Sequence, residues 1–462
     1  MTSRRYDALV FGGGSAGMAA AARIAAAGYS VAVLEREQEL GGVLNQCIHS
    51  GFGLKVFRED LTGPEYAERF SERLAASPGV EVYLETTAQE VGSPQTGAPA
   101  SSRPEGRVSP PGSTLPGYAP PGALPAAGQA AQPSSGTEAP LTVFGYSRRH
   151  GVLQLGARAG VLAMGCRERN RGNVGIPGTR PAGVFTAGFA QRLLNVDGYL
   201  PGRRAVIVGS GDIGLIMARR LTWAGATVLG VVEIQSYPSG LTRNVVQCLN
   251  DFGIPLYLSH VVSRILGRNR VEAVEVCPLA DGAARLDKAF RLDCDTVLLS
   301  VGLLPDTELA KKLGVALNPV TGGPLVDAGL QTSVPGVFAC GNLLHVHDLV
   351  DFVTEEAERC GAQVAEYLAG DFERLQHRVA PGANVRYVVP NSYFPGRDNR
   401  FYLRALVVKN QARLEVRLGG ELLKQRRLAH VQPSEMVSFT LKPGELSGLP
   451  ARPDQTLEVS IA

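Results

Sequence analysis

The feature that most constrains this 462-residue chain is the stretch 6–35, YDALVFGGGSAGMAAAARIAAAGYSVAVLE. An apolar strand, a glycine turn, an alanine-rich helix, a second apolar strand and an acid follow one another, as in a dinucleotide-binding strand–helix–strand unit. Gly12 allows a sharp turn, Gly14 allows close approach of a pyrophosphate, and Gly17 allows the helix to pack on the sheet. The phosphates would bind the free N–H groups of the helix start. Glu35 is placed to accept hydrogen bonds from ribose hydroxyls.

A second stretch, 203–233 (RRAVIVGSGDIGLIMARRLTWAGATVLGVVE), repeats this order of elements. Gly209, Gly211 and Gly214 occupy the glycine positions, and Glu233 is the terminal acid. Because each copy can bind one dinucleotide, the chain is predicted to hold two. Glu233 would repel a 2′-phosphate and hydrogen-bond a free 2′-hydroxyl, and no arginine follows it directly. This favours NADH over NADPH.

Length, charge and cysteine content set the broader class. A chain of 462 residues is expected to form about two to four domains. The formal charge of +3 is close to balanced, so no nucleic-acid partner is expected. Seven cysteines without regular spacing argue against a disulfide framework and favour a reducing cytoplasm. No apolar run reaches the length of a membrane span, and the early strand leaves no room for a cleavable export signal.

The first half of the chain contains several further predicted elements. Residues 39–54, ELGGVLNQCIHSGFGL, form a glycine-rich loop with polar side chains that could wrap a cofactor. Thr62 and Glu65 make a capping box for a helix that ends near residue 76, and a strand follows at 80–84. From about 92 to 140, proline, glycine, serine and alanine dominate, which predicts a disordered insertion in a surface loop.

After the insertion, the pattern returns to that of a folded chain. A hairpin is predicted at 141–144 and 152–155, and a buried strand at 160–165. Two more buried strands, TVLLSVG and VPGVFACGN, end at Gly302 and Asn342. A helix over about 353–368 follows, and the positive end of its dipole would suit the electron-rich edge of a reduced flavin.

The last part of the chain, from about residue 381, alternates apolar and polar side chains. This pattern predicts a small antiparallel β domain. The region contains no cysteine, so it is not expected to hold an iron–sulfur cluster. The predicted strands are 401–408, 412–418, 436–441 and 456–461.

The two glycine motifs together with VPGVFACGN resemble the pyridine nucleotide-disulfide oxidoreductase superfamily of FAD- and NAD(P)H-binding flavoproteins over about residues 5–370. The resemblance implies that the first motif binds FAD, that the second binds the nicotinamide nucleotide, and that the strand ending at Asn342 returns to the flavin. Asn342 replaces the usual aspartate but can still hydrogen-bond the ribityl and phosphate region. The implied FAD residues are Gly12, Gly14, Ser15, Ala16, Gly17, Glu35, Gly42, Gly165, Gly341 and Asn342, and the implied nicotinamide nucleotide residues are Gly209, Gly211, Asp212, Ile213, Gly214 and Glu233.

The resemblance also implies an α/β fold class with a definite organisation. Two Rossmann-like dinucleotide-binding domains are expected, with the FAD domain discontinuous and the NAD domain inserted into it. A small C-terminal β-rich domain follows. The expected boundaries are 1–200 for the first part of the FAD domain, with 92–140 as the insertion, then 201–325 for the NAD(H) domain, 326–375 for the second part of the FAD domain and 380–462 for the β domain.

Several departures from the superfamily pattern limit the chemistry. The disulfide reductases carry two cysteines four residues apart after the paired glycines, whereas this loop has only Cys47, at neither usual position. Without a second thiol, internal disulfide exchange has no partner. His430 and Glu435 reproduce the spacing of the reductases' His/Glu dyad, but in a β context we interpret this as coincidence. Ala163, Met164 and Gly165 stand where Ala-Thr-Gly is common.

Three segments, GGVLNQCIHSGFGL, LTGPEYAERF and GSGDIGLIMARR, are similar to a subgroup without the redox disulfide. This subgroup comprises FAD-dependent oxidoreductases associated with anaerobic-type glycerol-3-phosphate dehydrogenases, and resembles the FAD subunits of hydrogen cyanide synthase and of opine and proline dehydrogenases. The resemblance implies electron exchange with a partner dehydrogenase subunit or an electron carrier.

The expected chemistry is hydride transfer between the nicotinamide C4 and the flavin N5, which the cofactors themselves perform. Cys47, His49 and His347 are the candidate catalytic side chains, because the loop after Gly42 and the segment after Asn342 should lie near the flavin. Cys47 could instead be a thiol that only fills space. His345, His347 and Asp348 could instead cap the following helix. Two histidines and one acid are a minimal ligand set, so no metal site is expected.

Three functions remain open from the sequence. The leading one is an NADH-linked flavoprotein that works with a partner. The second is an NADH oxidase or peroxidase that uses Cys47, and the third is a non-catalytic nucleotide-sensing scaffold with the β domain as its interaction surface. The sequence does not fix the electron acceptor, the direction of transfer or the oligomeric state.

Overall fold

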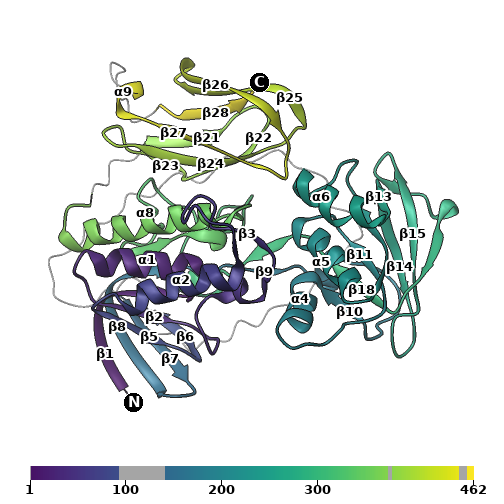
Figure 1. Ribbon diagram of the computed structural model, residues 1–462. Helices are drawn as coiled ribbons and strands as arrows, with labels where there is room; N and C mark the ends of the chain where they lie inside the picture. Colours follow the sequence, from purple (N-terminus) through teal and green to yellow (C-terminus); the bar gives the residue numbers. More distant parts are fainter. Residues whose placement is uncertain (1, 93–140, 373–376, 447–454) are drawn as a thin grey trace, which may run out of the picture.

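The computed structural model describes residues 2–92, 141–372, 377–446 and 455–462. Almost all of the predicted insertion at 92–140 therefore lies outside the described residues. Three sheet-containing units are visible in Figure 1: the amino-terminal sheet with its helices, a second sheet unit in teal, and the carboxy-terminal strands in yellow-green beside α8.

The first sheet is built around the opening motif. Its strand order is β5-β2-β1-β8, with β20 and β7 both pairing with β8 and with β6 beyond β7. The pairs β1–β2, β1–β8, β2–β5 and β8–β20 are parallel, and β6–β7 and β7–β8 are antiparallel. The strands are β1 (Thr2–Phe11), β2 (Val31–Leu34), β5 (Val80–Tyr83), β6 (Thr86–Gly92), β7 (Leu141–Ser147), β8 (Gly151–Leu162) and β20 (Val337–Ala339).

Three helices pack with this sheet: α1 (Ser15–Ala26), α2 (Gly63–Ala75) and α8 (Val350–Ala369). The predicted capping box of α2 is present, because the Thr62 hydroxyl and the Glu65 carboxylate each accept a hydrogen bond from the other residue's backbone N–H. Gly361 in α8 lies against α1, where an added Cβ would be 2.6 Å from the Ala20 carbonyl oxygen. The long α8 thus packs closely on the first helix of the opening motif.

The hairpin predicted after the insertion differs in one respect. β7 and β8 do pair as a hairpin, but β8 continues from Gly151 to Leu162 as one strand. Its first half pairs with β7 and its second half with β20. The predicted strands at 152–155 and 160–165 are therefore two parts of one element, and the small residues between them do not interrupt it.

The second sheet is parallel, with the order β10-β18-β11-β12-β13. It confirms the second strand–helix–strand repeat, with α5 between β11 and β12. A smaller antiparallel sheet of β14, β15, β16 and β17 adjoins it. The elements are β10 (Val184–Thr186), β11 (Arg204–Val208), β12 (Thr227–Glu233), β13 (Leu256–Leu258), β18 (Thr296–Leu299), α4 (Ala187–Asn195), α5 (Asp212–Trp223), α6 (Thr242–Cys248), β14 (His260–Leu266), β15 (Ala273–Ala280), β16 (Ala283–Ala284) and β17 (Phe290–Asp293).

The C-terminal strands form two sheets, β23-β21-β28-β25-β26 and β22-β24-β27. Most pairs are antiparallel, as predicted, but β21 and β28 pair in parallel. Tyr387 and Val389 of β22 pack into the core of the first sheet, so the two regions share buried apolar surface. The strands are β21 (His377–Pro381), β22 (Val385–Val389), β23 (Ser392–Tyr393), β24 (Asn399–Ala405), β25 (Lys409–Leu418), β26 (Glu421–Val431), β27 (Met436–Leu441) and β28 (Leu457–Ile461).

Short elements complete the described chain. They are β3 (Ser50–Phe52), β4 (Leu61–Thr62), β9 (Cys166–Glu168), β19 (Leu303–Pro305), α3 (Arg171–Val174), α7 (Glu308–Lys312) and α9 (Pro443–Leu446), with 3₁₀ turns that include Gly42–Gln46 and Gly341–Leu343. The domain boundaries given above remain predictions. None of the helices in the described ranges combines the length and apolar character of a membrane span.

Candidate functional site

The turn between β1 and α1 requires glycine at two positions. Gly12 has a φ of +102°, and a Cβ there would lie 2.6 Å from the Ala163 carbonyl oxygen. A Cβ on Gly17 would lie 1.8 Å from the Gly12 carbonyl oxygen. Both distances are too short for a side chain, so these glycines let the turn pack on itself and on the end of β8.

Gly14 differs from these two glycines, because no atom lies within 4 Å of the Cβ that it lacks. It is the N-cap of α1, which has no side-chain cap and no acidic residue in its first turn. The side of Gly14 that lacks a Cβ is therefore open, and the first turn of α1 carries no competing carboxylate. This arrangement fits a pyrophosphate, which binds such free N–H groups through hydrogen bonds and the helix dipole.

Glu35 is held at the end of β2 by two backbone donors. Its Oε2 accepts a hydrogen bond from Gly13 N–H at 2.6 Å, and its Oε1 accepts one from Glu37 N–H at 2.8 Å. The carboxylate is buried. It lies against the glycine turn, and its expected role as the ribose-binding acid remains a prediction.

The second glycine turn has the same close packing and the same hydrogen bonds to its terminal acid as the first. Gly209 has a φ of +90°, and its missing Cβ would lie 2.1 Å from the Ser300 carbonyl oxygen. Oε2 of Glu233 accepts a hydrogen bond from Ser210 N–H at 2.9 Å, and its Oε1 accepts one from Gln235 N–H at 2.9 Å. Each terminal acid thus binds the turn before it and the backbone two residues after itself.

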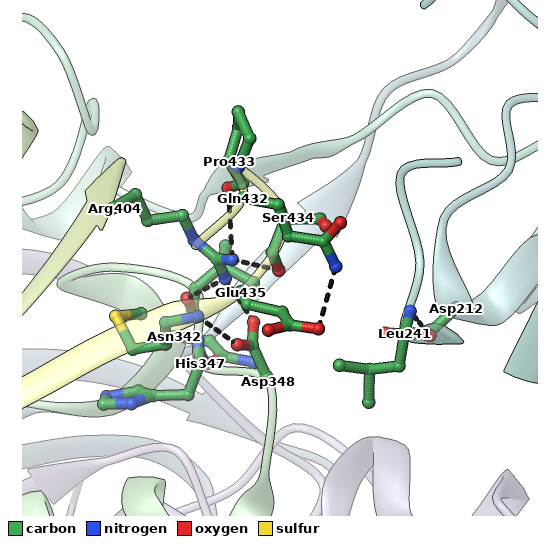
Figure 2. A network of polar contacts seen from close by, with 12 residues as sticks. Asp212, Leu241, Asn342, His347, Asp348, Arg404, Gln432, Pro433, Ser434 and Glu435 are labelled. Atoms are coloured by element: carbon green, nitrogen blue, oxygen red, sulfur yellow. Dashed lines mark hydrogen bonds and ion pairs between the residues drawn. The ribbon is translucent and has the colours of Figure 1, made fainter. Parts of the chain in front are cut away.

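The second turn also differs from the first. A Cβ on Gly211 would lie 3.2 Å from Ser300 Oγ, and Gly214 donates its N–H to that hydroxyl at 3.1 Å. Asp212 Oδ1 accepts hydrogen bonds from Leu241 N–H at 2.8 Å (Figure 2) and from Asn244 Nδ2 at 2.6 Å. Asp212 therefore ties the start of α5 to the start of α6. Ile213 is partly buried and packs against the core of this unit.

Two loops converge on the first turn. A Cβ on Gly42 would lie 3.4 Å from Gly14 Cα, and one on Gly341 would lie 2.7 Å from Ala16 Cβ. Gly341 also has a φ of +72°. The paired glycines and the return strand β20 are thus brought to the start of α1, as the resemblance implied. Ser15 lies partly exposed in the first turn of α1, and Gly165 follows β8 with open space beside it.

After Gly341, a polar network joins the return loop to the C-terminal strands (Figure 2). Asn342 Oδ1 accepts a hydrogen bond from His347 N–H at 3.0 Å. Asp348 forms an ion pair with Arg404 and accepts a hydrogen bond from Met436 N–H at 2.6 Å. Arg404 also donates to the carbonyl oxygens of Val346, at 3.1 Å, and Ser434. Asp348 and Arg404 therefore fasten β24 and β27 to this loop.

His345 and His347 point away from this network, toward Glu356 in α8. Glu356 Oε2 accepts a hydrogen bond from His345 Nε2 at 2.8 Å, and its Oε1 accepts one from Gly341 N–H at 2.7 Å. His347 Nε2 lies 3.4 Å from Glu356 Oε1. The expectation that His345, His347 or Asp348 caps α8 is wrong, because the N-cap is Leu349 without a side-chain hydrogen bond.

The histidine pair and its acid have perturbed acidities. Burial and the neighbouring His347 lower the pKa of His345 to about 4, so its imidazole is neutral at pH 7. Burial alone raises the pKa of Glu356, but its contacts with His345 and His347 lower it below its ordinary value. Glu356 could not be recognised from the sequence, because it lies among charged residues in a helix, where a solvated face is the simplest interpretation.

With this geometry established, comparison with known proteins places the chain. The family profile described as pyridine nucleotide-disulphide oxidoreductase matches residues 144–363, and the profile described as NAD(P)-binding Rossmann-like domain matches residues 10–67. Residues 144–363, just under half of the chain, thus carry a domain of the pyridine nucleotide-disulphide oxidoreductase family. The predicted family, fold class and enzyme class are thereby confirmed, and FAD is the flavin cofactor that this family implies.

Relatives and solved structures agree with this placement. An NADH oxidase of Methanocaldococcus jannaschii is 34% identical over 33% of this chain and 32% of its own length. Hydrogen cyanide synthase subunit HcnB of Pseudomonas protegens is 25% identical over 72% of this chain and 65% of its own length. The crystal structure of a T. acidophilum thioredoxin reductase has a TM-score of 0.58 and 20% identity, over 79% of this chain and 99% of that one. This likeness shows the fold.

The chain therefore spans about a third of the NADH oxidase relative and about two thirds of the HcnB relative. The NAD(P)-binding Rossmann-like profile covers the first glycine turn, and the pyridine nucleotide-disulphide oxidoreductase profile covers the second. The assignment of individual residues to the two dinucleotides remains a prediction.

Cys47 lies in this oxidoreductase as a protonated, hydrogen-bonded thiol. Its Sγ donates to the Val43 carbonyl oxygen at 3.3 Å and to Gln191 Oε1 at 3.7 Å. Burial raises the pKa of Cys47 to about 12, so the thiolate is scarce at neutral pH. All seven cysteines are free thiols. The raised pKa disfavours a reactive thiolate, and the catalytic role expected for Cys47 remains a prediction.

His49 lies on the same loop and faces the second unit. Its Nδ1 is 2.9 Å from the Ser50 carbonyl oxygen, and its ring lies 5.0 Å from that of Phe52. Burial and the charges of Arg219 and Arg243 lower its pKa. Its catalytic role remains a prediction.

His430 and Glu435 do not act on each other. His430 Nδ1 lies 2.7 Å from Asn410 Oδ1 on the neighbouring strand, and Glu435 Oε1 accepts a hydrogen bond from Gln432 Nε2 at 2.8 Å (Figure 2). These contacts agree with the interpretation that their spacing is a coincidence.

Proposed function

We propose that the chain is an FAD-dependent NADH oxidoreductase that exchanges electrons with a partner dehydrogenase or electron carrier. The observation that carries this proposal is the pair of glycine turns. Each turn leads into the N-terminus of a helix and donates a backbone hydrogen bond to a buried acid, Glu35 at the first turn and Glu233 at the second. Two such turns in one chain suit a pair of dinucleotides between which a hydride passes.

The first turn is proposed to bind FAD. The N–H groups of α1 would bind the pyrophosphate, Glu35 the ribose, and the loops at Gly42 and Gly341 would border the rest of the cofactor. When bound, the flavin would accept a hydride from the nicotinamide. The chain itself would position the two cofactors. Glu356 holds the loop at Gly341 by accepting the backbone N–H of that residue, and His345 hydrogen-bonds the other oxygen of the same carboxylate.

The second turn is proposed to bind NADH in preference to NADPH. Glu233 is buried, and its Oε2 also accepts hydrogen bonds from the Ser210 and Ser239 hydroxyls at 2.6 and 2.9 Å. Because these hydrogen bonds fix the carboxylate of Glu233, it cannot rotate to avoid the negative charge of a 2′-phosphate on NADPH. Oε1, which accepts only the Gln235 N–H, retains one acceptor site for a 2′-hydroxyl.

A partner subunit is the proposed route for the electrons. The HcnB relative is named as a subunit of hydrogen cyanide synthase. Within this chain the loop after Gly42 offers one cysteine, so an internal disulfide relay is not part of the proposal. A glycerol-3-phosphate dehydrogenase-like protein is one form that the partner could take, and its identity would come from co-purification. The free thiols support a reducing cytoplasm as the location.

An NADH oxidase or peroxidase based on Cys47 is the less favoured function, because the raised pKa of this thiol disfavours the thiolate that such chemistry needs. A nucleotide-sensing scaffold is also less favoured, because it leaves the pairing of two dinucleotide turns without a purpose.

Anaerobic mixing of the purified flavoprotein with NADH tests the proposal. We expect the visible absorbance of the flavin to be bleached, and re-oxidation by air to be much slower than re-oxidation by a co-purified partner or an artificial electron acceptor. If NADH leaves the flavin absorbance unchanged, the scaffold function is supported instead. Fast oxygen consumption that disappears in Cys47→Ser would support the oxidase.

A further inference from the structure

The cluster of His345, His347 and Glu356 contains more polar groups than its hydrogen bonds use. The side chains of all three residues are fully buried. One candidate ligand atom from each lies within 4.8 Å of the others. The two imidazole rings are 4.2 Å apart, with an angle of 48° between their planes. Two imidazoles and one carboxylate are therefore gathered at one point inside the protein.

The hydrogen bonds within the cluster leave His347 without a partner. Neither ring nitrogen of His347 makes a hydrogen bond, and Nδ1 of His345 makes none either. The 3.4 Å separation between His347 Nε2 and Glu356 Oε1 brings the two atoms together without hydrogen-bond geometry. Buried polar groups in proteins are nearly always satisfied, so a bound species is the simplest explanation for an imidazole left in this state.

The local sequence explains how the ligand atoms meet. His345 and His347 are two residues apart in a non-helical segment, a spacing that can place both side chains on the same side of the chain. Glu356 reaches them from the second turn of α8. Asp348, the acid nearest in sequence, takes no part, because its carboxylate is occupied by Arg404 and by Met436 N–H.

The spacing of these atoms is close to that of a tetrahedral metal site. Metal–ligand bonds of about 2.0–2.1 Å place the ligand atoms about 3.3 Å apart. His345 Nε2 lies 2.8 Å from Glu356 Oε2, and His347 Nε2 lies 3.4 Å from Glu356 Oε1. Each imidazole is therefore near this spacing from a different oxygen of the carboxylate, and the side chains must adjust for all three residues to bind one ion. The set of two histidines and one glutamate is also one that zinc uses in proteins.

We propose that His345, His347 and Glu356 bind one divalent transition-metal ion of the zinc class. Because Glu356 also accepts the Gly341 N–H, the ion would fasten the loop 341–347 to α8. Tyr402 of β24 borders the site, with its ring 5.1 Å from that of His347 and its buried hydroxyl without a hydrogen-bond partner. The ion would therefore stabilise the junction between the return loop and the C-terminal strands. This role is independent of hydride transfer.

Metal analysis of the untagged, full-length flavoprotein tests the proposal directly. The protein is purified without chelators, incubated with Zn²⁺, freed of excess metal and analysed by mass spectrometry for metal per chain. We expect about one equivalent of tightly bound metal. X-ray absorption of the same sample should show imidazole scattering and nitrogen or oxygen ligands at about 2.0–2.1 Å. A content near zero, or a metal with sulfur ligands, would overturn the proposal.

Two variants and a control locate the site. His347→Ala and Glu356→Gln should each lower the bound metal at least tenfold. His430→Ala should retain it, because this exposed histidine lies on β26 and contacts Asn410. Retention of metal by a folded His347→Ala protein would contradict the assignment. If a variant fails to fold, the ligand identities come from the X-ray absorption of the wild-type protein, and the proposal remains falsifiable on that measurement.

Discussion

At the scale of single residues, Cys47 is the side chain whose role the structure changes most. Cys47→Ser should retain NADH-driven flavin reduction within about twofold of the wild-type rate, because the thiol is protonated and only hydrogen-bonded to Val43 and Gln191. The rate is measured by anaerobic stopped-flow absorbance.

The same residue gives a prediction for pH dependence. Since burial raises the pKa of Cys47 to about 12, its alkylation by iodoacetamide should stay slow at pH 8 and increase only at strongly alkaline pH. Mass spectrometry of the peptide that contains Cys47 follows the reaction, with an unfolded sample as the reference. Rapid alkylation of the folded protein at pH 7 would show a thiolate and would support the oxidase function.

Glu233 gives a second prediction at this scale. Glu233→Ala should lower the ratio of kcat/KM for NADH to that for NADPH by on the order of tenfold, or ~1.4 kcal/mol, because the repulsion of the 2′-phosphate and the bond to the 2′-hydroxyl are both lost. Steady-state kinetics with both nucleotides and an artificial acceptor measure the ratio. An unchanged ratio would mean that neighbouring residues set the preference.

Some of these residues could be identified from sequence patterns and others could not. Glu35 and Glu233 could be predicted, because each ends a strand at a fixed distance from a glycine turn. Glu356 could not, since it lies in the charged run TEEAER, and only its packing under the return loop distinguishes it from its solvated neighbours. The direction in which Cys47 faces also depends on contacts with α4, which no local pattern encodes.

At the scale of elements, the first glycine turn separates the requirements of folding from those of binding. Gly17→Ala should lower the free energy of unfolding by about 2–3 kcal/mol, because its Cβ would lie 1.8 Å from a backbone oxygen. Gly14→Ala should change the stability of the flavin-free protein by less than about 1 kcal/mol, because its Cβ meets no atom within 4 Å.

The two variants should therefore behave differently toward the flavin. Gly14→Ala is expected to fold and yet retain much less flavin, since its methyl group would occupy the proposed pyrophosphate position. Urea unfolding of the flavin-free proteins and the ratio of flavin to protein measure the two effects. Full flavin retention by Gly14→Ala would show that the pyrophosphate does not approach this glycine.

Most helices and strands were predictable because their signals are local. The capping box at Thr62 and Glu65 fixes the start of α2, and apolar runs identify β11 and β18. The strand β26 was not among the predicted strands because its apolar and polar residues do not alternate, and all of its side chains except that of Val431 are at least partly exposed. Its position depends on pairing with β25. The parallel pairing of β21 with β28 likewise joins distant segments.

At the scale of the whole molecule, the C-terminal strands are anchored through the pair of Asp348 and Arg404. Arg404→Ala should destabilise the protein by about 3 kcal/mol, because it leaves a mostly buried carboxylate without its partner. Arg285→Ala is the control, since its pair with Asp287 is exposed and should contribute less than about 1 kcal/mol. Urea unfolding and limited proteolysis compare the variants. Equal stabilities would indicate that the junction depends on apolar contacts such as those of Tyr387.

The arrangement of the units was only partly predictable. The repeated glycine motif indicated two dinucleotide units, and the change of pattern near residue 381 indicated a third, β-rich one. The contact between the third unit and the return loop was not foreseen, because Asp348 and Arg404 are far apart in sequence and each is unremarkable alone. Such contacts follow from the packing of the whole chain.

We propose that NADH bound at the second turn delivers a hydride to the flavin bound at the first. The most direct test is anaerobic stopped-flow reduction with NADH and with NADH deuterated at the transferred C4 position. We expect the flavin to be bleached in both cases and deuteration to slow bleaching by about twofold or more, equivalent to ~0.4 kcal/mol or more in the barrier. A flavin that remains oxidised in the presence of saturating NADH would contradict it.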